Sequence, residues 1–385
     1  MSTTPQPHLL VVGAFPKGDS KIFGGMVTSC KALLQSSLPR QVRLELLDST
    51  QISVPPPSFP VRLGYAMWRV ARYVHRLERR KPDAVLLFVA IGASVAEKGV
   101  MAWYARLRGV QALMFPRGGE IIEASAGSRM TRFWVRLAFR GASVMLCQSP
   151  KWRDFAQSLG FSGARAAVIP NWTATPDLLA IGKARHRSSD APAKLLFLGW
   201  LDRAKGVGEL LEACLRLKPG HCFTLDIAGE GKYSREARAY VERNGLSDIV
   251  RFRGWITGDE LHAAFAESNV LVLPSYVEGL PNAMVEAMAA GLAVVVTGVG
   301  SIPDVVADEH DALVIGPRDV DALERALRRV IEDVPLRDRL GTAACARAEA
   351  QFAVEPAVEK IVGVVREAMS MRDQRQPRKS TSRPA

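Results

Sequence analysis

The sequence contains few features that would indicate an oxidising compartment or a membrane-spanning segment. The five cysteines lie far apart and show neither a paired disulfide framework nor a metal-binding C-x-x-C spacing. The most apolar run, Ala84 to Ala96, is well short of the ~20 residues that a membrane-spanning helix needs, and we interpret it as a buried strand. Met1 to His8 lacks the basic start and apolar stretch of a signal peptide. We therefore expect a cytoplasmic protein.

Acidic residues are scarce in one half of the chain only. Residues 1–180 hold 23 Lys and Arg against 10 Asp and Glu, whereas residues 181–385 hold 28 against 29, so the net charge of +12 comes from the first half. The 385 residues, 48% of them hydrophobic and 23% charged, have globular composition and exceed the size at which a single core stops growing. Two domains are expected.

Apolar, strand-like runs alternate with amphipathic stretches through both halves. In the first half we predict strands at 9–12, 43–47, 84–89, 112–115 and 143–147 and helices at 26–38, 62–80 and 129–139. In the second half we predict strands at 195–198, 224–228, 249–252, 270–273 and 293–297 and helices at 208–217, 235–244, 258–267, 282–290 and 320–332. This alternation predicts an α/β protein with two doubly wound parallel sheets. Ligands of such sheets bind at the carboxyl ends of the strands.

A polar stretch separates the two series of elements. Residues 183–193 have little apolar periodicity and suit a linker. The N-terminal domain is then expected over residues 1–182 and the C-terminal domain over 194–351. The basic residues 371–385 are of low complexity, and we expect them to be disordered.

Two glutamates bracket a turn at a predicted strand-to-helix junction. After the strand at 270–273 the chain reads Glu278-Gly279-Leu280-Pro281-Asn282, and the following helix contains Glu286. Backbone N–H groups at a helix start favour an anion such as the diphosphate of a nucleotide sugar. We expect Glu286 to accept hydrogen bonds from a ribose diol, and Glu278 to bind sugar hydroxyls or to face the anomeric carbon. Alternatively, both glutamates only support the helix start.

Three further loops could contact phosphate. Gly199 to Gly206 follows a predicted strand and contains Arg203 and Lys205, two cations that could neutralise charge on a departing nucleoside diphosphate. Gly229-Glu230-Gly231 would let the backbone approach a nucleotide closely. Gly24-Gly25 precedes a predicted helix in the first half and offers a second anion site. For each loop an ordinary structural turn is the alternative.

These strings, in this order, resemble the family-4 retaining glycosyltransferases of the GT-B fold over nearly the whole chain. The counterparts of the family's five motifs are Gly24-Gly25, Pro170-Asn171, Gly199 to Gly206, Gly229 to Gly231, and Glu278 to Glu286. The resemblance implies two Rossmann-like domains facing across a cleft, and a C-terminal helix at about 352–370 that returns to the N-terminal, acceptor-binding domain. It also implies a donor nucleoside-diphosphate sugar as co-substrate, with no other cofactor.

The resemblance extends to roles for single residues. It places the donor ribose at Glu286, the donor sugar near Glu278, and sugar and phosphate against the backbone of Gly279, Leu280 and Asn282. It assigns the diphosphate to Lys205, and Gly25, Arg203, Gly229 and Gly231 complete the predicted donor-binding set.

Two positions depart from the family's commonest pattern. Trp200 stands where an arginine is common, so that Arg203 is left to supply the charge. Arg117 stands where many members have a histidine, and we take it as a catalytic candidate with Glu278 and Lys205 and name no histidine base.

An Asp-x-Asp string, which binds metal in other glycosyltransferases, occurs at Asp319-Val320-Asp321. It directly precedes the predicted helix at 320–332, where acidic residues cap a helix and complement its dipole. We therefore predict a helix cap and no metal site.

Basic and aromatic residues share two predicted helices of the first half. They are Arg62, Tyr65, Trp68, Arg69, Arg72, Tyr73, Arg76, Arg79 and Arg80, and then Arg129, Arg132, Phe133, Trp134, Arg136 and Arg140. This composition suits an anionic membrane surface, and the alternative is a solvated face whose aromatics lie in the core. Nucleic acid is not expected as a partner, because no DNA- or RNA-binding motif accompanies the charge.

The sequence thus predicts a retaining, metal-independent hexosyltransferase. It would use a UDP- or GDP-sugar and a glycan or lipid-linked acceptor in the synthesis of a surface polysaccharide or lipopolysaccharide, in the cytoplasm or on the inner face of the membrane. The alternatives are a sugar-nucleotide epimerase or a phosphorylase of the same fold, and a non-catalytic nucleotide-sugar-binding protein.

Overall fold

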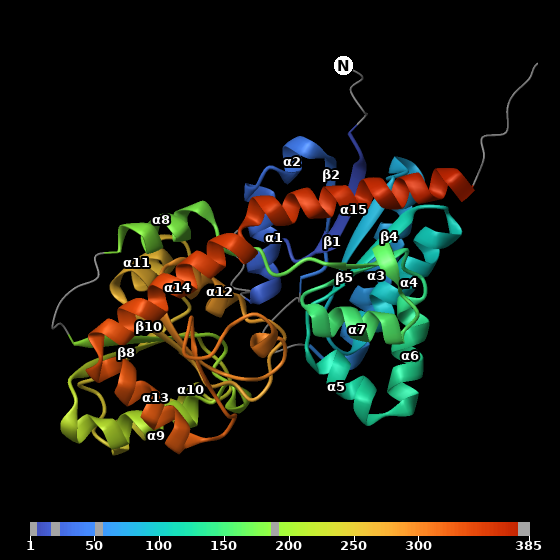
Figure 1. The fold of residues 1–385 in the computed structure, drawn as a ribbon. Coiled ribbons are helices and arrows are strands. Elements are labelled where there is room, and N and C mark those ends of the chain that lie inside the picture. Colours follow the sequence, from blue (N-terminus) through green and yellow to red (C-terminus); the bar gives the residue numbers. More distant parts are fainter. Residues whose placement is uncertain (1–5, 17–23, 51–56, 186–191, 376–385) are drawn as a thin grey trace, which may run out of the picture. The chain divides into compact units, whose positions relative to one another are not determined.

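The chain folds into two compact units, each built around its own parallel sheet (Figure 1). The computed structural model describes residues 6–16, 24–50, 57–185 and 192–375. The first unit comprises Met1–Ile22, Leu33–Ile169 and Glu355–Ala385, and the second comprises Phe23–Ala32 and Pro170–Val354.

The sheet of the first unit has six parallel strands in the order β2-β1-β3-β4-β5-β6. They are β1 (His8–Gly13), β2 (Arg43–Asp48), β3 (Ala84–Val89), β4 (Gln111–Pro116), β5 (Val144–Cys147) and β6 (Ala166–Val168). Its helices are α2 (Leu38–Gln41), α3 (Phe59–Arg80), α4 (Ala93–Leu107), α5 (Glu120–Gly127), α6 (Arg129–Phe139) and α7 (Pro150–Ser158). Helix α15 (Val354–Arg375) packs into this unit, and α1 (Gly25–Gln35) contributes its last residues. Every residue of β3 is buried, which explains its continuous apolar sequence.

The sheet of the second unit has the order β12-β11-β10-β7-β8-β9, also all parallel. Its strands are β7 (Ala193–Leu198), β8 (Phe223–Ala228), β9 (Val250–Gly254), β10 (Val270–Leu273), β11 (Ala293–Thr297) and β12 (Leu313–Ile315). Its helices are α8 (Pro176–Ala184), α9 (Val207–Leu217), α10 (Ser234–Arg243), α11 (Asp259–Glu267), α12 (Asn282–Ala289), α13 (Val320–Glu332) and α14 (Val334–Phe352). The order is that of a Rossmann sheet, with the chain reversing direction across the sheet between β7 and β10. Both sheets confirm the predicted α/β class.

The structure adds elements that the sequence did not predict, namely α4, α5, α7, β6, α8, β12 and α14. The helix predicted at 26–38 is divided into α1 and α2. The predicted linker begins inside α8, and its residues 186–191 lie outside the described ones. Likewise α15 continues to Arg375, so the predicted disordered tail begins as helix, and residues 376–385 lie outside the described ones.

Two further observations bear on the sequence predictions. The Asp319 side chain accepts a hydrogen bond of 2.8 Å from the N–H of Ala322 at the start of α13, which confirms its role as a helix cap. Within the part of the chain that the structure describes, none of the helices combines the length and the apolar composition needed to cross a bilayer.

Candidate functional site

The candidate site of the second unit lies at the carboxyl ends of β7 and β10, the two strands between which the sheet order reverses. In open α/β sheets, this switch point is where loops from neighbouring strands diverge and leave a crevice for a ligand. The loop after β7 carries Arg203 and Lys205, and the loop after β10 carries Glu278 and leads into α12. The topology thus brings both predicted donor-binding loops to one place.

Glycines let these loops pack closely against one another. Gly206 has φ +69°, and a Cβ atom there would lie 2.1 Å from the carbonyl oxygen of Pro274 in the loop after β10. A Cβ on Gly229 would lie 1.8 Å from the oxygen of Gly199, and one on Gly231 would lie 2.3 Å from the oxygen of Leu201. Gly206, Gly229 and Gly231 are therefore required by backbone contact between the loops, whether or not a ligand is bound.

Lys205 and Glu278 form an ion pair across the two loops. The Lys205 Nζ lies 2.6 Å from the Glu278 Oε1, and both side chains are largely shielded from water. Arg203, two residues earlier, is exposed, and its guanidinium lies over the ring of Tyr233 at 5.6 Å. The pair fixes Lys205 at the switch point, while two of its three ammonium protons remain for other acceptors.

Glu286 is a buried carboxyl group in the second turn of α12. Only 6% of the residue is exposed, and no hydrogen bond or ion pair from the described residues reaches its carboxylate. Burial raises the pKa of Glu286 to about 7, because the charged form loses its hydration without gaining a partner. A buried, unpaired carboxyl group costs free energy, so its presence points to a ligand or to another function.

Asn282, the first residue of α12, ties three segments together. Its Nδ2 donates to the carbonyl oxygen of Gly25 at 2.6 Å and to Ser29 Oγ at 3.0 Å, and its Oδ1 accepts from Asn171 Nδ2 at 2.7 Å. Asn171 Nδ2 also lies 2.7 Å from the carbonyl oxygen of Leu280. The Asn282 side chain is thus committed to positioning, which leaves only the backbone of Gly279 to Asn282 for the predicted contacts with sugar and phosphate.

The same network places Gly25. A Cβ at Gly25 would lie 3.2 Å from Asn282 Nδ2, and one at Gly24, where φ is +146°, would lie 3.8 Å from Trp200 Nε1. The predicted Gly-Gly loop therefore lies against α12 and the loop after β7, in the second unit.

The sequence reasoning missed Ser275, Tyr276 and Trp255 at this edge, and it noted Trp200 only as a departure from the family pattern. The Tyr276 hydroxyl hydrogen-bonds to Glu209, and burial together with this bond raises the pKa of Tyr276 to about 12. The rings of Trp200 and Trp255 meet edge to face at 4.7 Å. Ser275 Oγ is buried without a hydrogen-bond partner in the described residues. Their position directly after β7, β9 and β10 was the available signal, since ligand contacts come from those loops.

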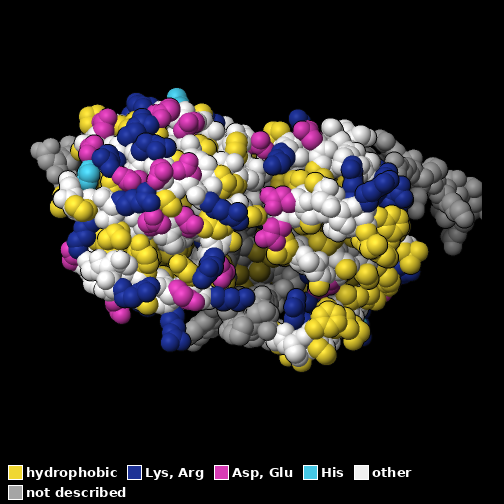
Figure 2. All heavy atoms as spheres, turned by 90° about the horizontal axis from the view of Figure 1, so that it is seen from below, with side chains coloured by type: hydrophobic (Ala, Val, Ile, Leu, Met, Phe, Trp, Pro, Cys, Tyr) yellow, Lys and Arg dark blue, Asp and Glu magenta, His cyan; other side chains and the backbone are white. Residues whose placement is uncertain are grey.

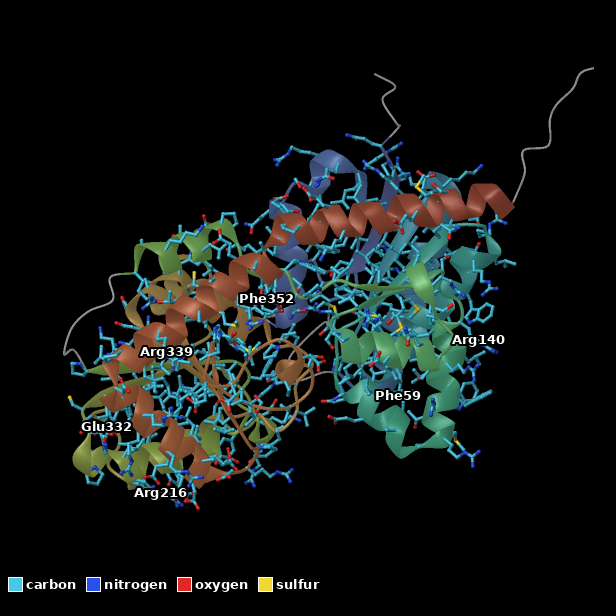
Figure 3. All side chains as sticks on the ribbon, in the orientation of Figure 1. Phe59, Arg140, Arg216, Glu332, Arg339 and Phe352 are labelled. Atoms are coloured by element: carbon cyan, nitrogen blue, oxygen red, sulfur yellow. The ribbon has the colours of Figure 1, made fainter. Side chains whose placement is uncertain are left out.

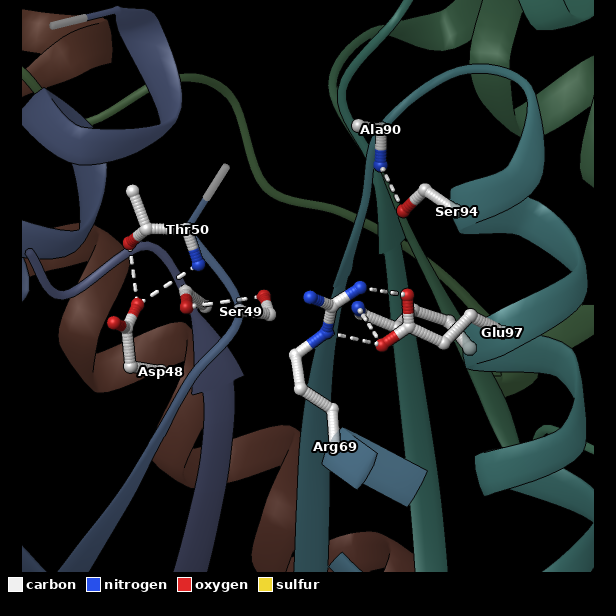
Figure 4. A network of polar contacts seen from close by, with 9 residues as sticks. Asp48, Ser49, Thr50, Arg69, Ala90, Ser94 and Glu97 are labelled. Carbon is white, nitrogen blue, oxygen red and sulfur yellow. Dashed lines mark hydrogen bonds and ion pairs between the residues drawn. The ribbon is translucent and has the colours of Figure 1, made fainter. Parts of the chain in front are cut away.

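The first unit carries a polar network at the carboxyl edge of its own sheet (Figure 4). Arg69 of α3 makes two hydrogen bonds of 2.8 Å to Glu97 of α4, and the buried Lys98 lies 3.1 Å from the same carboxylate. Burial raises the pKa of Glu97, but the hydrogen bond from Arg69 and the charges of Lys98 and Arg69 outweigh it, so that the net pKa is lowered. Burial likewise lowers the pKa of Lys98.

Arg117, the third catalytic candidate, follows β4 in the first unit. Its guanidinium lies over the ring of Phe115 at 5.0 Å, and its N–H donates to the carbonyl oxygen of Val89 at 2.9 Å. The other predicted site residues, Gly25, Arg203, Lys205, Gly229, Gly231, Glu278, Gly279, Leu280, Asn282 and Glu286, belong to the second unit.

Comparison with known proteins agrees with this division of the chain. The family model of glycosyl transferases group 1 matches residues 182–347, and that of a glycosyl transferase 4-like domain matches residues 31–172. The putative colanic acid biosynthesis glycosyltransferase WcaL of Salmonella typhimurium is 30% identical over 255 residues, which are 59% of this chain and 60% of the relative. The lipopolysaccharide core biosynthesis glycosyltransferase LpsE of Rhizobium meliloti is 29% identical over 272 residues, 69% of this chain and 70% of the relative. The chain thus spans about 60% of the length of WcaL.

Solved structures share the fold. Sucrose-phosphate synthase from Thermosynechococcus elongatus superimposes with a TM-score of 0.76 at 19% identity, over 95% of this chain and 100% of that chain. Anabaena Alr3699/HepE in complex with UDP and glucose gives a TM-score of 0.69 at 19% identity, over 94% and 100%. Identities this low show the fold alone, which is GT-B, with two Rossmann-like domains. The two family models together cover most of the chain, and the chain belongs to the group 1 glycosyltransferases.

Proposed function

We propose that this chain is a retaining, metal-independent hexosyltransferase. It moves a hexosyl group from a UDP- or GDP-sugar to a glycan or lipid-linked acceptor in the synthesis of a surface polysaccharide. The observation that carries the proposal is the buried, unpartnered carboxyl group of Glu286, on the helix that follows the loop of the Lys205–Glu278 pair.

Glu286 has the properties needed to hold a ribose. Two vicinal hydroxyls would give its two oxygens the hydrogen bonds that the described residues do not supply. Bonds to an ionised carboxylate are the strong ones, and ligand binding would favour the charged form of Glu286 against the effect of burial.

Lys205 and Glu278 have properties suited to the reacting end of the donor. When the sugar departs, negative charge develops on the diphosphate, and an ammonium group held at the switch point stabilises it. Arg203 on the same loop supplies a second cation. Glu278 orients Lys205 and is placed to accept hydrogen bonds from sugar hydroxyls. Arg117 of the first unit remains the candidate on the acceptor side.

The names of the relatives support the class of product. WcaL is named for colanic acid biosynthesis and LpsE for biosynthesis of the lipopolysaccharide core. The HepE structure contains UDP and glucose, which supports a uridine nucleotide as the first donor to try.

Thermal shift against a panel of nucleoside diphosphates tests the donor. UDP or GDP should raise the melting temperature, and Glu286→Ala should lose that rise while Glu332→Ala, an exposed glutamate on α13, keeps it. No shift with either nucleotide would contradict the proposal. Hydrolysis of the donor sugar in the absence of acceptor separates an enzyme from a binding protein, and recovery of an epimerised sugar nucleotide would favour the epimerase alternative.

The exposed aromatics of the first unit support a membrane location. Trp68 of α3 is 55% exposed, and Phe133 and Trp134 of α6 are each 60% exposed, whereas Tyr73 is buried in the core. Helix α6 carries three arginines and no acidic residue. Figure 2 shows hydrophobic side chains gathered over one side of this unit beside Lys and Arg, and Figure 3 labels Phe59 at the start of α3 and Arg140 after α6.

Arginine and aromatic side chains together suit the headgroup region of an anionic leaflet. We therefore include in the proposal a peripheral attachment of the first unit to such a membrane surface. Flotation with liposomes of neutral and anionic composition tests it, and absence of binding to anionic liposomes would contradict it.

A further inference from the structure

The first unit contains an apolar groove that the proposed function does not use. It has a volume of about 800 Å³ and is lined by α4, the start of α5, α6 and the loop after β3. This volume lies in the range of ligand-binding pockets, about 300–1,000 Å³. Of its lining side chains only one is charged, Glu120. The groove is therefore suited to a hydrocarbon ligand.

The floor of the groove is formed where α4 and α6 pack closely. A Cβ on Gly99 would lie 2.7 Å from the Cβ of Ala138, so the helices could not approach this closely with a larger residue there. The Trp103 Nε1 donates to the carbonyl oxygen of Leu137 at 2.8 Å and holds the indole across the two helices. Arg106 lies over the same indole at 5.4 Å. These contacts fix the wall of the groove near the end of α4.

The other end of the groove lies at the carboxyl edge of the sheet. Ile91 and Gly92 follow β3, and Glu120 and Ile121 follow β4, so the groove opens where ligands of parallel sheets bind. From Ala93 to Trp103 the helical rise gives a length of about 15 Å. Arg117 follows β4 at the same edge, outside the residues that line the groove.

The surroundings favour a lipid over an acidic protein partner. Among the described residues, the exposed large hydrophobic side chains all lie between Phe59 and Leu137, on α3, α4 and α6 and at Ile91. The groove is continuous with this surface through Val100, Trp103 and Trp134, which belong to both. Aromatic and aliphatic side chains in such density, with arginines between them, match a bilayer interface.

We propose that this groove holds the hydrocarbon chain of the glycosyl acceptor, a lipid with an anionic phosphate head. The chain lies between α4 and α6, and the head lies at the carboxyl edge of the sheet. This inference rests on the proposed function, since the acceptor is there a lipid-linked one.

Binding of butyl, octyl and dodecyl phosphate below their micellar concentrations tests the groove. Each methylene that enters it should strengthen binding roughly fourfold, until the chain is longer than the groove. Titration calorimetry should give one site per chain. Non-saturable binding, or an affinity that does not depend on chain length, would overturn the proposal.

Two substitutions fill the groove without removing apolar surface. Ala96→Phe and Ala124→Phe replace exposed lining residues and should each weaken dodecyl phosphate at least tenfold. Ala126→Phe, at an exposed position of α5 outside the lining, is the matched control and should bind as the wild type does. Because all three positions are exposed, folding should be retained, and unchanged melting temperatures would verify it. Unchanged dodecyl phosphate affinity in Ala96→Phe and Ala124→Phe would contradict the assignment.

Other occupants give different results. If the groove held a bulk membrane lipid, Ala96→Phe would weaken binding to anionic liposomes as well, whereas an acceptor chain leaves that binding intact. If a second copy of this chain filled it, light scattering would show a dimer that Ala96→Phe dissociates. Either result would overturn the proposal. Thermal shift with nucleotides separates failure of the proposed function from failure of the groove assignment. If UDP and GDP do not bind, the proposed function is wrong. If they bind while dodecyl phosphate does not, only the groove assignment is wrong.

Discussion

The two units share one architecture and differ in what they leave at the surface. Each is a parallel sheet of six strands covered by helices. In the second unit the unusual feature is polar and buried, the carboxyl group of Glu286. In the first unit it is apolar and exposed, the side chains from Phe59 to Leu137 on α3, α4 and α6.

The difference shows how one fold is adapted to two kinds of ligand. A buried carboxyl group discriminates by requiring hydrogen-bond donors in a fixed place, which suits a small polar molecule such as a nucleotide. An exposed apolar surface gains free energy from the area that it covers and demands little geometry, which suits hydrocarbon.

The largest expected effect on the reaction rate concerns Lys205, which stabilises the charge of the leaving diphosphate in the second unit. Lys205→Ala should lower kcat by about 10²–10³, because removal of one group that stabilises developing charge costs about 2.7–4 kcal/mol. Initial rates of donor hydrolysis measure it. Lys205→Arg should retain part of the activity, and a normal rate in Lys205→Ala would remove this residue from the chemistry.

The next effect concerns the ion network of the first unit. Glu97→Gln should destabilise that unit by about 3–5 kcal/mol, because it leaves Arg69 and the buried Lys98 without their carboxylate. The stabilisation exists above the unfolded pKa of Glu97 and is lost as the pH falls through its lowered folded pKa. Calorimetric melting at pH 7 checks it.

A matched pair on the surface of the same unit serves as the control. Glu78 and Arg108 form an exposed ion pair at 2.7 Å, and Glu78→Gln should change the melting temperature little. Equal losses in the two variants would mean that the buried network has no special role.

The third effect is a pH dependence of the stability of the second unit. The native carboxyl of Glu286, with its pKa of about 7, keeps a proton that the unfolded chain releases near pH 4.5, so the wild type loses stability as the pH rises between these values. The full loss amounts to ~3 kcal/mol above pH 7. Glu286→Gln has no such loss, and its melting temperature relative to the wild type should rise by several degrees between pH 4.5 and pH 8. A difference that stays constant with pH would contradict a neutral Glu286.

The smallest effect concerns the exposed aromatics of the first unit. The double variant Trp68→Ser and Phe133→Ser should weaken binding to anionic liposomes about thirtyfold, since each ring contributes on the order of 1 kcal/mol when half buried in the interface. Nucleotide binding should be unchanged. Sedimentation with liposomes measures the first quantity and thermal shift the second.

Strands that are completely buried were predicted from the sequence, because all of their residues are apolar. Elements in which apolar and polar residues alternate less regularly were missed. Strand β3 is apolar at every position, and its predicted bounds match the structure. The run from Ala84 to Ala96 concealed the junction at which α4 begins, because the break at Gly92, where φ is +63°, is the only local sign of it. Helix α14 buries one face largely through small residues, among them Gly341, Ala344 and Ala348, and this face is recognised only once the helix is packed.

The candidate site likewise has parts that the sequence predicted and parts that it did not. The order of motifs along the chain brought the predicted donor-binding loops to one edge of one sheet, which the strand order explains. The isolation of the Glu286 carboxyl and the engagement of Asn282 by Asn171 could not be predicted, since both depend on residues distant in sequence. The apolar groove likewise requires the close approach of α4 and α6 at Gly99.

Because the backbone packs tightly around Gly229 and Gly231, a match to this glycine motif in a related sequence is evidence of the fold and not of catalytic activity. A relative that had lost all catalytic activity would still need both glycines in order to fold, because any side chain there would clash with the backbone of Gly199 or Leu201. Selection for a folded domain alone would preserve the signature. The buried carboxyl of Glu286 opposes folding at neutral pH, so a lineage that keeps it is one in which ligand binding is still under selection.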